Sequence, residues 1–260
     1  MGELLRGKTA VITGGGSGIG AAISRAFAAE GAAVAVTDRD LKLAGRVAGE
    51  IREAGGNAAP WKMDVLNQPE IERTADEIEE KLGSISIWVN NAGVSIISPF
   101  IETSEQTWDL TLNVNLKGTF LGCQAACRKM ITRQSGVIIN MSSQSGKSGN
   151  SHYAAYCASK FGIIGLTQSL AVEFARDGIR VNALCPGVIF TPMWESQVAD
   201  YARKRDIKPE EVRPYMEVKI PMKRLGTPED VAQAALFLAG NGSSYITGQA
   251  INISGGSIMH

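Results

Sequence analysis

Three side chains near the middle of the chain have the types and spacing that proton exchange with an alcohol requires. Tyr156 and Lys160 are four residues apart in a segment of helical period, so they share one face of a helix. An ammonium beside a phenol favours the phenolate, which predicts a lowered pKa for Tyr156 and general acid–base catalysis there. Ser143, thirteen residues earlier, ends a strand-like run, and its hydroxyl could hold the substrate oxygen. Because this Tyr–Lys spacing is also common on helices without a catalytic task, the serine is what favours catalysis.

A glycine-rich turn near the N-terminus is a second candidate site. It lies between a strand-like run, residues 9–13, and a segment of helical period. Glycines lack Cβ, so backbone N–H groups and the positive end of a helix can approach a pyrophosphate. The spacing departs from a strict GxGxxG, and glycines also form ordinary strand-to-helix turns. The residues expected to contact a dinucleotide here are Gly14, Ser17, Gly18, Ile19 and Gly20.

Asp38 ends the next strand-like run, twenty residues after Gly18. A carboxylate at this position can hydrogen-bond the adenosine ribose hydroxyls of NAD. It also repels a 2′-phosphate, because two like unit charges about 4 Å apart cost roughly 4 kcal/mol at an effective dielectric of ~20. The sequence therefore predicts NAD as the cofactor in preference to NADP. Arg39 leaves the alternative open, since a guanidinium there could pair with a 2′-phosphate.

These side chains need a scaffold, and the chain provides seven short apolar runs that alternate with longer segments of helical period. Such alternation predicts right-handed crossovers and a parallel sheet with helices on both faces. We therefore expect a single α/β domain over residues 1–260, with a Rossmann-like doubly wound fold and a seven-stranded parallel sheet. The expected strands are residues 9–13, 33–37, 58–63, 85–90, 137–141, 180–184 and 250–253. The expected helices are residues 19–30, 41–54, 69–82, 105–133, 154–176 and 228–239.

Residues 189–224, called the lid segment below, break this alternation. The segment contains four prolines and follows a strand end, which is typical of a substrate-binding lid. From Asp200 to Arg224 there are eight basic and five acidic residues. A phosphorylated substrate would need such cations, although a solvated helix face explains them as well. Two residues near the reacting centre are further candidates for substrate contact: Lys147, and His152, which could bind a polyol hydroxyl or could be a loop histidine without a catalytic task.

Composition excludes several other classes of protein. The 26 basic and 26 acidic residues balance, and without a long Lys/Arg run the attraction that drives nucleic-acid binding is missing. The apolar stretch 231–240 has about half the length that spans a bilayer, so no membrane partner is expected. A cytoplasmic location is expected because the N-terminus lacks the regions of a signal peptide. The four cysteines include no CxxC pair, so neither a disulfide framework nor a metal site is expected.

Over essentially its whole length the sequence resembles the short-chain dehydrogenase/reductase superfamily. The resemblance implies that Tyr156 exchanges a proton with the substrate hydroxyl while Ser143 holds the substrate oxygen. It implies that Lys160 binds the nicotinamide ribose and lowers the pKa of Tyr156, and that Asn115 supports a water relaying protons to Lys160. The motifs in the family's order are Thr13-Gly14-x-x-x-Gly18-x-Gly20, Asp64-Val65, Asn90-Asn91-Ala92-Gly93, Asn115, Ser143, Tyr156-x-x-x-Lys160 and Pro186-Gly187.

The same resemblance implies further cofactor contacts and an assembly. Asp64 and Val65 would flank the adenine, and Val188 and Thr191 would close over the nicotinamide amide. A homotetramer would form through the helices at 105–133 and 154–176. The remaining residues implied to line the cofactor cleft are Asn91, Ala92, Gly93, Pro186 and Gly187.

Segments in the second half of the chain are similar to the sugar-alcohol branch of this family. The implied reaction is NAD-dependent interconversion of a small-molecule polyol, sorbitol 6-phosphate or free sorbitol, and its ketose. A reductase of 3-oxoacyl thioesters or of other ketones is the alternative within the enzyme class, and it would usually favour NADPH. A dinucleotide-binding regulator without catalysis is disfavoured by the complete set Asn115, Ser143, Tyr156 and Lys160.

Overall fold

The computed structural model describes residues 2–260 and contains one seven-stranded parallel sheet with the order β3-β2-β1-β4-β5-β6-β7. The predicted fold is confirmed, and the predicted strand boundaries agree within two residues. The inner strands are nearly continuous apolar runs because helices cover both faces of the sheet. The strands are β1 (Thr9–Thr13), β2 (Ala33–Asp38), β3 (Asn57–Lys62), β4 (Ile85–Asn90), β5 (Gly136–Met141), β6 (Ile179–Pro186) and β7 (Ala250–Ile253).

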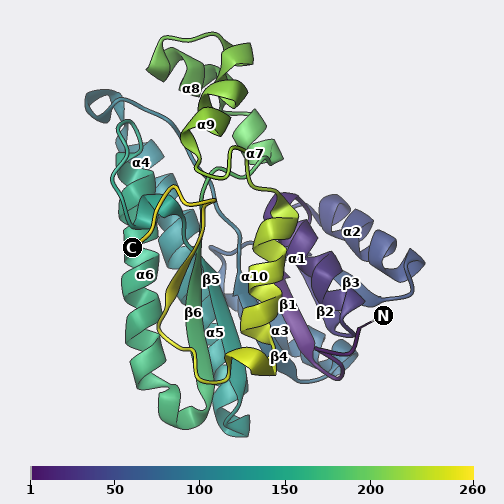
Figure 1. Cartoon of the computed structure of the whole chain (residues 1–260). Helices are drawn as coiled ribbons and strands as arrows, with labels where there is room; N and C mark the ends of the chain where they lie inside the picture. The colour runs from purple at the N-terminus through teal and green to yellow at the C-terminus, as the bar shows by residue number, and fades with distance from the viewer. Residues whose placement is uncertain (1) are drawn as a thin grey trace.

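Three long helices cover each face of the sheet (Figure 1). One layer consists of α1 (Gly18–Ala29), α2 (Leu41–Glu53) and α10 (Pro228–Ala239), whose apolar residues share a core with β1 and β2. The other consists of α3 (Gln68–Leu82), α5 (Gly118–Met130) and α6 (Ala154–Glu173). All strands point their carboxyl ends toward the same edge of the sheet, so the turns that follow them meet there.

The predicted helix at 105–133 is interrupted. It consists of α4 (Glu105–Leu112), a π-helical turn (Asn113–Lys117), α5 and a final 3₁₀ turn (Ile131–Arg133). The π turn contains Asn115, whose amide is bonded to Val94 and Ser159 in other elements. Single π turns inside α-helices are frequent at functional sites.

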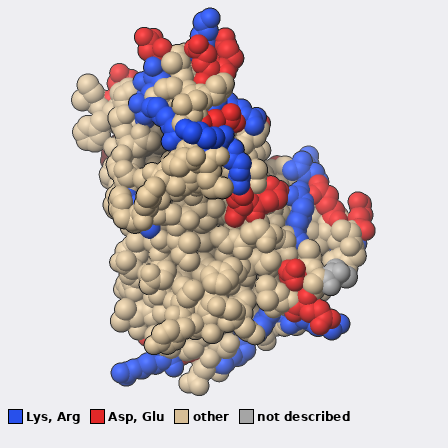
Figure 2. All heavy atoms as spheres, in the orientation of Figure 1, with Lys and Arg blue, Asp and Glu red and all other residues tan. Residues whose placement is uncertain are grey.

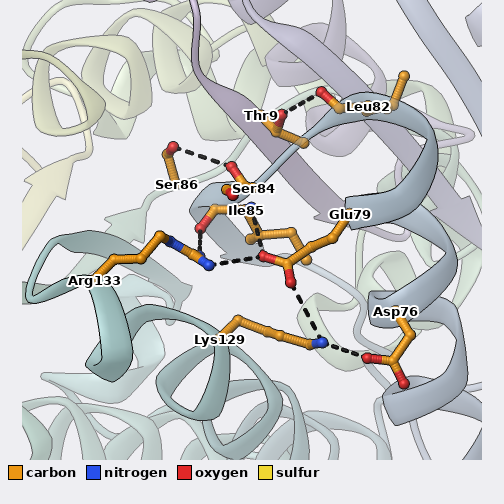
Figure 3. A network of polar contacts seen from close by, with 9 residues as sticks. All are labelled: Thr9, Asp76, Glu79, Leu82, Ser84, Ile85, Ser86, Lys129 and Arg133. Carbon is orange, nitrogen blue, oxygen red and sulfur yellow. Dashed lines mark hydrogen bonds and ion pairs between the residues drawn. The ribbon is translucent and has the colours of Figure 1, made fainter.

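A charged network joins α3 to the end of α5 and to the start of β4 (Figure 3). Lys129 pairs with Asp76 and Glu79, and Arg133 pairs with Glu79 at 3.1 Å. Arg133 Nη2 also donates to the Ile85 carbonyl at 2.7 Å, while the Ile85 N–H donates to Glu79 Oε1 at 3.0 Å. These contacts hold the start of β4, the strand whose other end leads into the glycine-lined cleft described below.

The lid segment forms short helices above the carboxyl edge of the sheet (Figure 1). They are α7 (Pro192–Glu195), α8 (Val198–Arg205), a 3₁₀ turn (Pro209–Glu211) and α9 (Val212–Lys219). Two of its prolines, Pro192 and Pro209, occupy first-turn positions, where a missing N–H has no cost. The segment and the residue that follows it share a small core, which consists of Tyr201, Ala202, Val212, Met216, Ile220 and Leu225. Among residues 2–260, no helix combines the length and apolar character needed to cross a bilayer.

Candidate active site

A cleft of about 790 Å³ opens at the carboxyl edge of the sheet, under the lid segment. It lies where the strand order reverses between β1 and β4, the position at which open parallel sheets bind their ligands. Most of the predicted site residues line it: Gly14, Ser17, Gly18, Ile19, Asp38, Asp64, Val65, Asn91, Ala92, Gly93, Ser143, Tyr156, Lys160, Pro186, Gly187, Val188 and Thr191.

The glycine turn has the geometry of an anion cradle. Gly14 has a φ of +61°, and a Cβ built on it would lie 3.0 Å from the Cα of Ala92. Ser17 precedes α1, and its hydroxyl makes no capping bond to the helix, so the helix N-terminus faces the cleft without an internal cap. Unsatisfied N–H groups at a helix start favour a phosphate.

Gly20, which was predicted to contact the cofactor, does not line the cleft. A Cβ at this position would lie 2.2 Å from the Gly14 carbonyl oxygen and 2.5 Å from Asn91 Nδ2. The glycine is required for close packing of α1 against the turn.

Hydrogen bonds tie the ends of β1 and β4 together on the two sides of the cleft. Thr13 Oγ1 accepts from the N–H groups of Asn91 and Ala92 at 2.9 and 3.0 Å. Asn91 Nδ2 donates to the carbonyls of Thr13 and Gly14 at 3.0 and 3.1 Å. These hydrogen bonds fix the backbone that a bound dinucleotide would contact.

Asp38 holds its carboxylate at the end of β2, beside the glycine turn. Oδ2 accepts from the Gly16 N–H at 3.1 Å and Oδ1 from the Asp40 N–H at 3.0 Å. Both Asp38 and Arg39 line the cleft. A negative charge is therefore positioned at one end of the cleft, with an exposed guanidinium next to it.

Ser143, Tyr156 and Lys160 lie at the middle of the same cleft. Lys160 Nζ is 5.5 Å from the centroid of the Tyr156 ring and donates to the Met141 carbonyl at 2.8 Å. Ser143 accepts from the Ser145 N–H at 3.1 Å and hydrogen-bonds with Tyr156. The neighbouring Ser142 instead donates its hydroxyl to the Lys160 carbonyl, at 2.9 Å.

The pKa of Tyr156 differs from the predicted one. Burial raises the pKa of Tyr156, and the hydrogen bond with Ser143 offsets only part of that rise. The predicted lowering of this pKa by Lys160 is wrong for this geometry, because the ammonium bonds to a main-chain carbonyl and itself loses solvation. Burial lowers the pKa of Lys160 to about 8. At neutral pH the phenol therefore keeps its proton and can act as an acid.

Asn115 does not reach the cleft. It is fully buried; its Oδ1 accepts from the Val94 N–H at 2.8 Å, and its Nδ2 donates to the Val94 carbonyl and to Ser159 Oγ at 2.9 and 3.0 Å. A Cβ on Gly93 would lie 3.1 Å from Asn115 Oδ1 and 3.7 Å from Lys160 Nζ. In this structure Asn115 holds the segment after β4 against α6. The water relay between Asn115 and Lys160 that the resemblance implies stays a prediction.

The two predicted substrate residues are also outside the cleft lining. Lys147 Nζ donates to the Ala250 carbonyl in β7 at 2.6 Å. His152 has a φ of +63°, and its carbonyl accepts from the Ser98 N–H. Proximity in sequence to Ser143 and Tyr156 does not determine where a loop side chain points.

Sequence patterns do not indicate a further group of residues that line the cleft. They come from the start of α6 and from the lid segment, and include Tyr153, Trp194, Gln197, Tyr201 and Arg205. Their positions within a proline-rich insertion after a strand end were the one available signal. Of the eight basic residues between 200 and 224, only Arg205 lines the cleft; three others form ion pairs, namely Arg203 with Asp200, Arg213 with Glu217 and Arg224 with Asp230.

A Lys160→Met variant is expected to be more stable than the wild type at pH 7. Lowering the pKa of Lys160 from 10.5 to about 8 costs the folded wild type about 3 kcal/mol at pH 7. The variant avoids this cost but loses the hydrogen bond to Met141, which is worth about 1 kcal/mol. The unfolded state binds the extra proton between pH 8 and 10.5, so the wild type gains stability as pH rises through that window and the advantage of the variant shrinks. Urea unfolding at pH 7 and pH 10 measures this.

Lys208→Met, which removes an exposed lysine of the lid segment, is the control and should leave stability unchanged at both pH values. A Lys160→Met variant that is less stable at pH 7 would show that the contacts of the ammonium outweigh its desolvation.

The chain is similar to known proteins over nearly its whole length. Residues 14–257 match the family model described as "Enoyl-(Acyl carrier protein) reductase". The chain is 40% identical to 3-oxoacyl-[acyl-carrier-protein] reductase FabG of Thermotoga maritima, over 98% of this chain and 99% of that protein.

Two solved structures are similar over nearly the whole chain. Actinorhodin polyketide ketoreductase, solved with NADPH, superposes with a TM-score of 0.94 at 35% identity and covers 99% of both chains. Sorbitol-6-phosphate 2-dehydrogenase SrlD from Erwinia amylovora has a TM-score of 0.93 at 39% identity, over 96% of this chain and all of that one. With a matching family model, similar relatives over full length and this arrangement of Ser143, Tyr156 and Lys160, the chain belongs to the short-chain dehydrogenase/reductase family of nicotinamide-dinucleotide-dependent oxidoreductases.

Proposed function

We propose that this oxidoreductase uses NAD to interconvert a secondary alcohol of a sugar alcohol and the corresponding ketose. The observation that carries the proposal is one continuous cleft with the Asp38 carboxylate at one end and Ser143, Tyr156 and Lys160 at its centre. The likeness to sorbitol-6-phosphate 2-dehydrogenase supports the choice of substrate class.

The residues present fit a nicotinamide dinucleotide. Ser17 and the N-terminus of α1 would hold the pyrophosphate, and Asp38 would accept hydrogen bonds from the adenosine ribose. Lys160, buried at the centre of the cleft, would bond the nicotinamide ribose. When bound, the cofactor supplies the hydride acceptor or donor, so the protein contributes positioning and proton transfer.

Tyr156 and Ser143 perform the proton chemistry in this proposal. In ketone reduction the phenol of Tyr156 donates its proton to the carbonyl oxygen, and the Ser143 hydroxyl holds the same oxygen by a hydrogen bond. In alcohol oxidation Tyr156 accepts the hydroxyl proton, which requires that its own proton has left first. The raised pKa of Tyr156 favours the donating form at neutral pH.

A reductase of 3-oxoacyl thioesters is a second candidate. The substrate end of the cleft includes apolar side chains that suit an acyl chain, among them Leu110, Val114, Met193 and Met216. The identity to the Thermotoga maritima reductase supports this alternative equally well. Asp38 disfavours it where the reductase requires NADPH, because the carboxylate repels the 2′-phosphate.

A spectrophotometric screen separates the two candidates. NAD reduction is followed with sorbitol, sorbitol 6-phosphate, galactitol and xylitol, and NADH or NADPH oxidation is followed with acetoacetyl-CoA. Turnover of a polyol with NAD supports the proposal. Turnover of acetoacetyl-CoA together with inertness toward all four polyols would establish the second candidate instead.

We also propose a homotetramer, and expect a mass in solution of about 110 kDa, four times the 27.6 kDa of the chain. Large apolar side chains are exposed on α5 and α6, among them Phe120, Phe161 and Val172, the last at 81% exposure. Figure 2 shows that the left side of the body below the lid segment presents a broad surface with few charged side chains. Burial of such surfaces between subunits is the expected reason for assembly.

Light scattering coupled to size exclusion measures this mass. Val172→Asp should give smaller species, because it places a charge on α6, whereas Val218→Asp on α9 is the matched control with 69% exposure and should stay tetrameric. A wild-type protein that elutes as a 27.6 kDa monomer would disprove the tetramer.

A further inference from the structure

Arg205, the last residue of α8, is the one charged residue of the lid segment that lines the cleft. Its Nε donates to the Tyr201 hydroxyl at 3.3 Å, and its Cζ lies 5.6 Å from the centroid of the Tyr201 ring. Within residues 2–260, the two terminal nitrogens of this guanidinium have neither a hydrogen bond nor an ion pair. The side chain is thus held by one edge and offers its other edge to a ligand.

The ring that holds Arg205 is itself fixed. Tyr201 is 4% exposed and packs edge-on against Trp194, with 5.3 Å between ring centroids. A guanidinium that stacks on a buried ring loses little further freedom when it binds a planar or tetrahedral anion. Arg205 is itself exposed, and its contacts with Tyr201 restrict the guanidinium before a ligand binds.

Lys204 lies between the ring of Tyr201 and the aromatic pair that Tyr153 forms with the catalytic Tyr156. Lys204 Nζ lies 4.7 Å from the Tyr153 ring centroid and 5.7 Å from that of Tyr201, and the Tyr153 and Tyr156 rings are 6.0 Å apart. The same Nζ donates to Asn150 Oδ1 at 2.8 Å. A row of aromatic rings thus leads from the Tyr156 phenol along the cleft to the guanidinium of Arg205.

The charge at this end of the cleft is not balanced by the protein. Among the described residues, the acidic side chains that line the cleft are Asp38 and Asp64, and both belong to the cofactor half. Arg205 has Lys204 beside it, and neither forms an ion pair with a carboxylate within residues 2–260. An anion supplied by the ligand would complete the arrangement.

We propose that Arg205 binds an anionic group of the substrate, a phosphate or a carboxylate, at the end remote from the oxygen that faces Ser143 and Tyr156. This inference rests on the proposed function, since it assigns a substrate class to the same cleft. The free edge of the guanidinium can bind either group by two parallel hydrogen bonds.

The test compares Arg205→Gln with Arg203→Gln, which removes the same charge from the same helix but from a side chain outside the cleft lining. Two substrate pairs are used with NAD: sorbitol 6-phosphate against sorbitol, and 3-hydroxybutyrate against its methyl ester. Equilibrium binding of each compound to the NADH-loaded protein is measured by calorimetry in parallel. The pair that responds identifies the anion as phosphate or carboxylate.

In the responding pair, the wild type is expected to favour the anionic member. Arg205→Gln should raise the KM and the dissociation constant of the anionic member about 10- to 100-fold, as expected for a charged hydrogen-bonded pair. The kcat, and both constants of the neutral member, should change little. Arg203→Gln should leave all of these values unchanged. A merely structural role of Arg205 would affect both members of a pair alike.

Equal affinity for the anionic and neutral members of both pairs would overturn the inference, as would equal losses in the two variants or the absence of anion binding. Binding that depends on Arg205 without turnover of either pair would uphold the inference and refute the proposed polyol function.

Discussion

A Tyr156→Phe variant is expected to lose about 10²- to 10⁴-fold in kcat, the range in which a general acid or base contributes. The substitution removes only the hydroxyl, so the ring still packs beside Lys160 and Tyr153. Without the phenol, no proton is delivered to the carbonyl oxygen in reduction, and Ser143 alone cannot supply it. The rate is measured at saturating substrate in both directions, using the substrate that the screen identifies.

The affinity of Tyr156→Phe for NADH should remain close to that of the wild type, because the glycine turn and Asp38 are not altered. Tyr245→Phe removes a hydroxyl from a fully exposed tyrosine and is the matched control; its kcat should not change. Undiminished turnover by Tyr156→Phe would refute the proposed acid–base role.

An Asp38→Asn variant is expected to shift cofactor preference toward NADP by up to about 10³-fold, the ratio that corresponds to roughly 4 kcal/mol of like-charge repulsion at ~4 Å. Asparagine keeps an oxygen that can accept from the Gly16 or Asp40 N–H, so the end of β2 should remain in place. With the carboxylate gone, Arg39 lies free to pair with the 2′-phosphate. The measured quantity is the ratio of kcat/KM values for NADP and NAD.

Asp40→Asn is the matched control, since it removes the same charge two residues away and its side chain can still cap α2 through the Lys42 N–H. That ratio should stay at the wild-type value in this control. A wild type that already uses NADP as well as NAD would contradict the repulsion and would assign the 2′-phosphate to Arg39.

The architecture could be predicted because its determinants are local. Each inner strand is a short apolar run, as burial on both faces demands, and each long helix carries its apolar residues at helical spacing. The exception is the helix at 105–133, where a π turn surrounds Asn115. That interruption depends on Val94 and Ser159, which are distant in sequence, so no local pattern indicates it.

The centre of the candidate site could also be predicted, because helical spacing places Tyr156 and Lys160 on one face and the strand end places Ser143 near them. The pKa of Tyr156 could not be predicted from the sequence. It depends on the burial of the phenol in the folded chain and on where the Lys160 ammonium finds its hydrogen bond, and the sequence specifies neither.

By itself, the sequence determined the doubly wound sheet and the residue types at the candidate site, since these follow from periodicity and from where strands end. Only the tertiary structure decided which side chains of the segments between the main strands and helices enter the cleft. Lys147, four residues from Ser143, turns away to bond Ala250, whereas Arg205, far along the chain, lines the cleft. The physical reason is that such a side chain takes its direction from hydrogen bonds and packing with residues that only folding brings near.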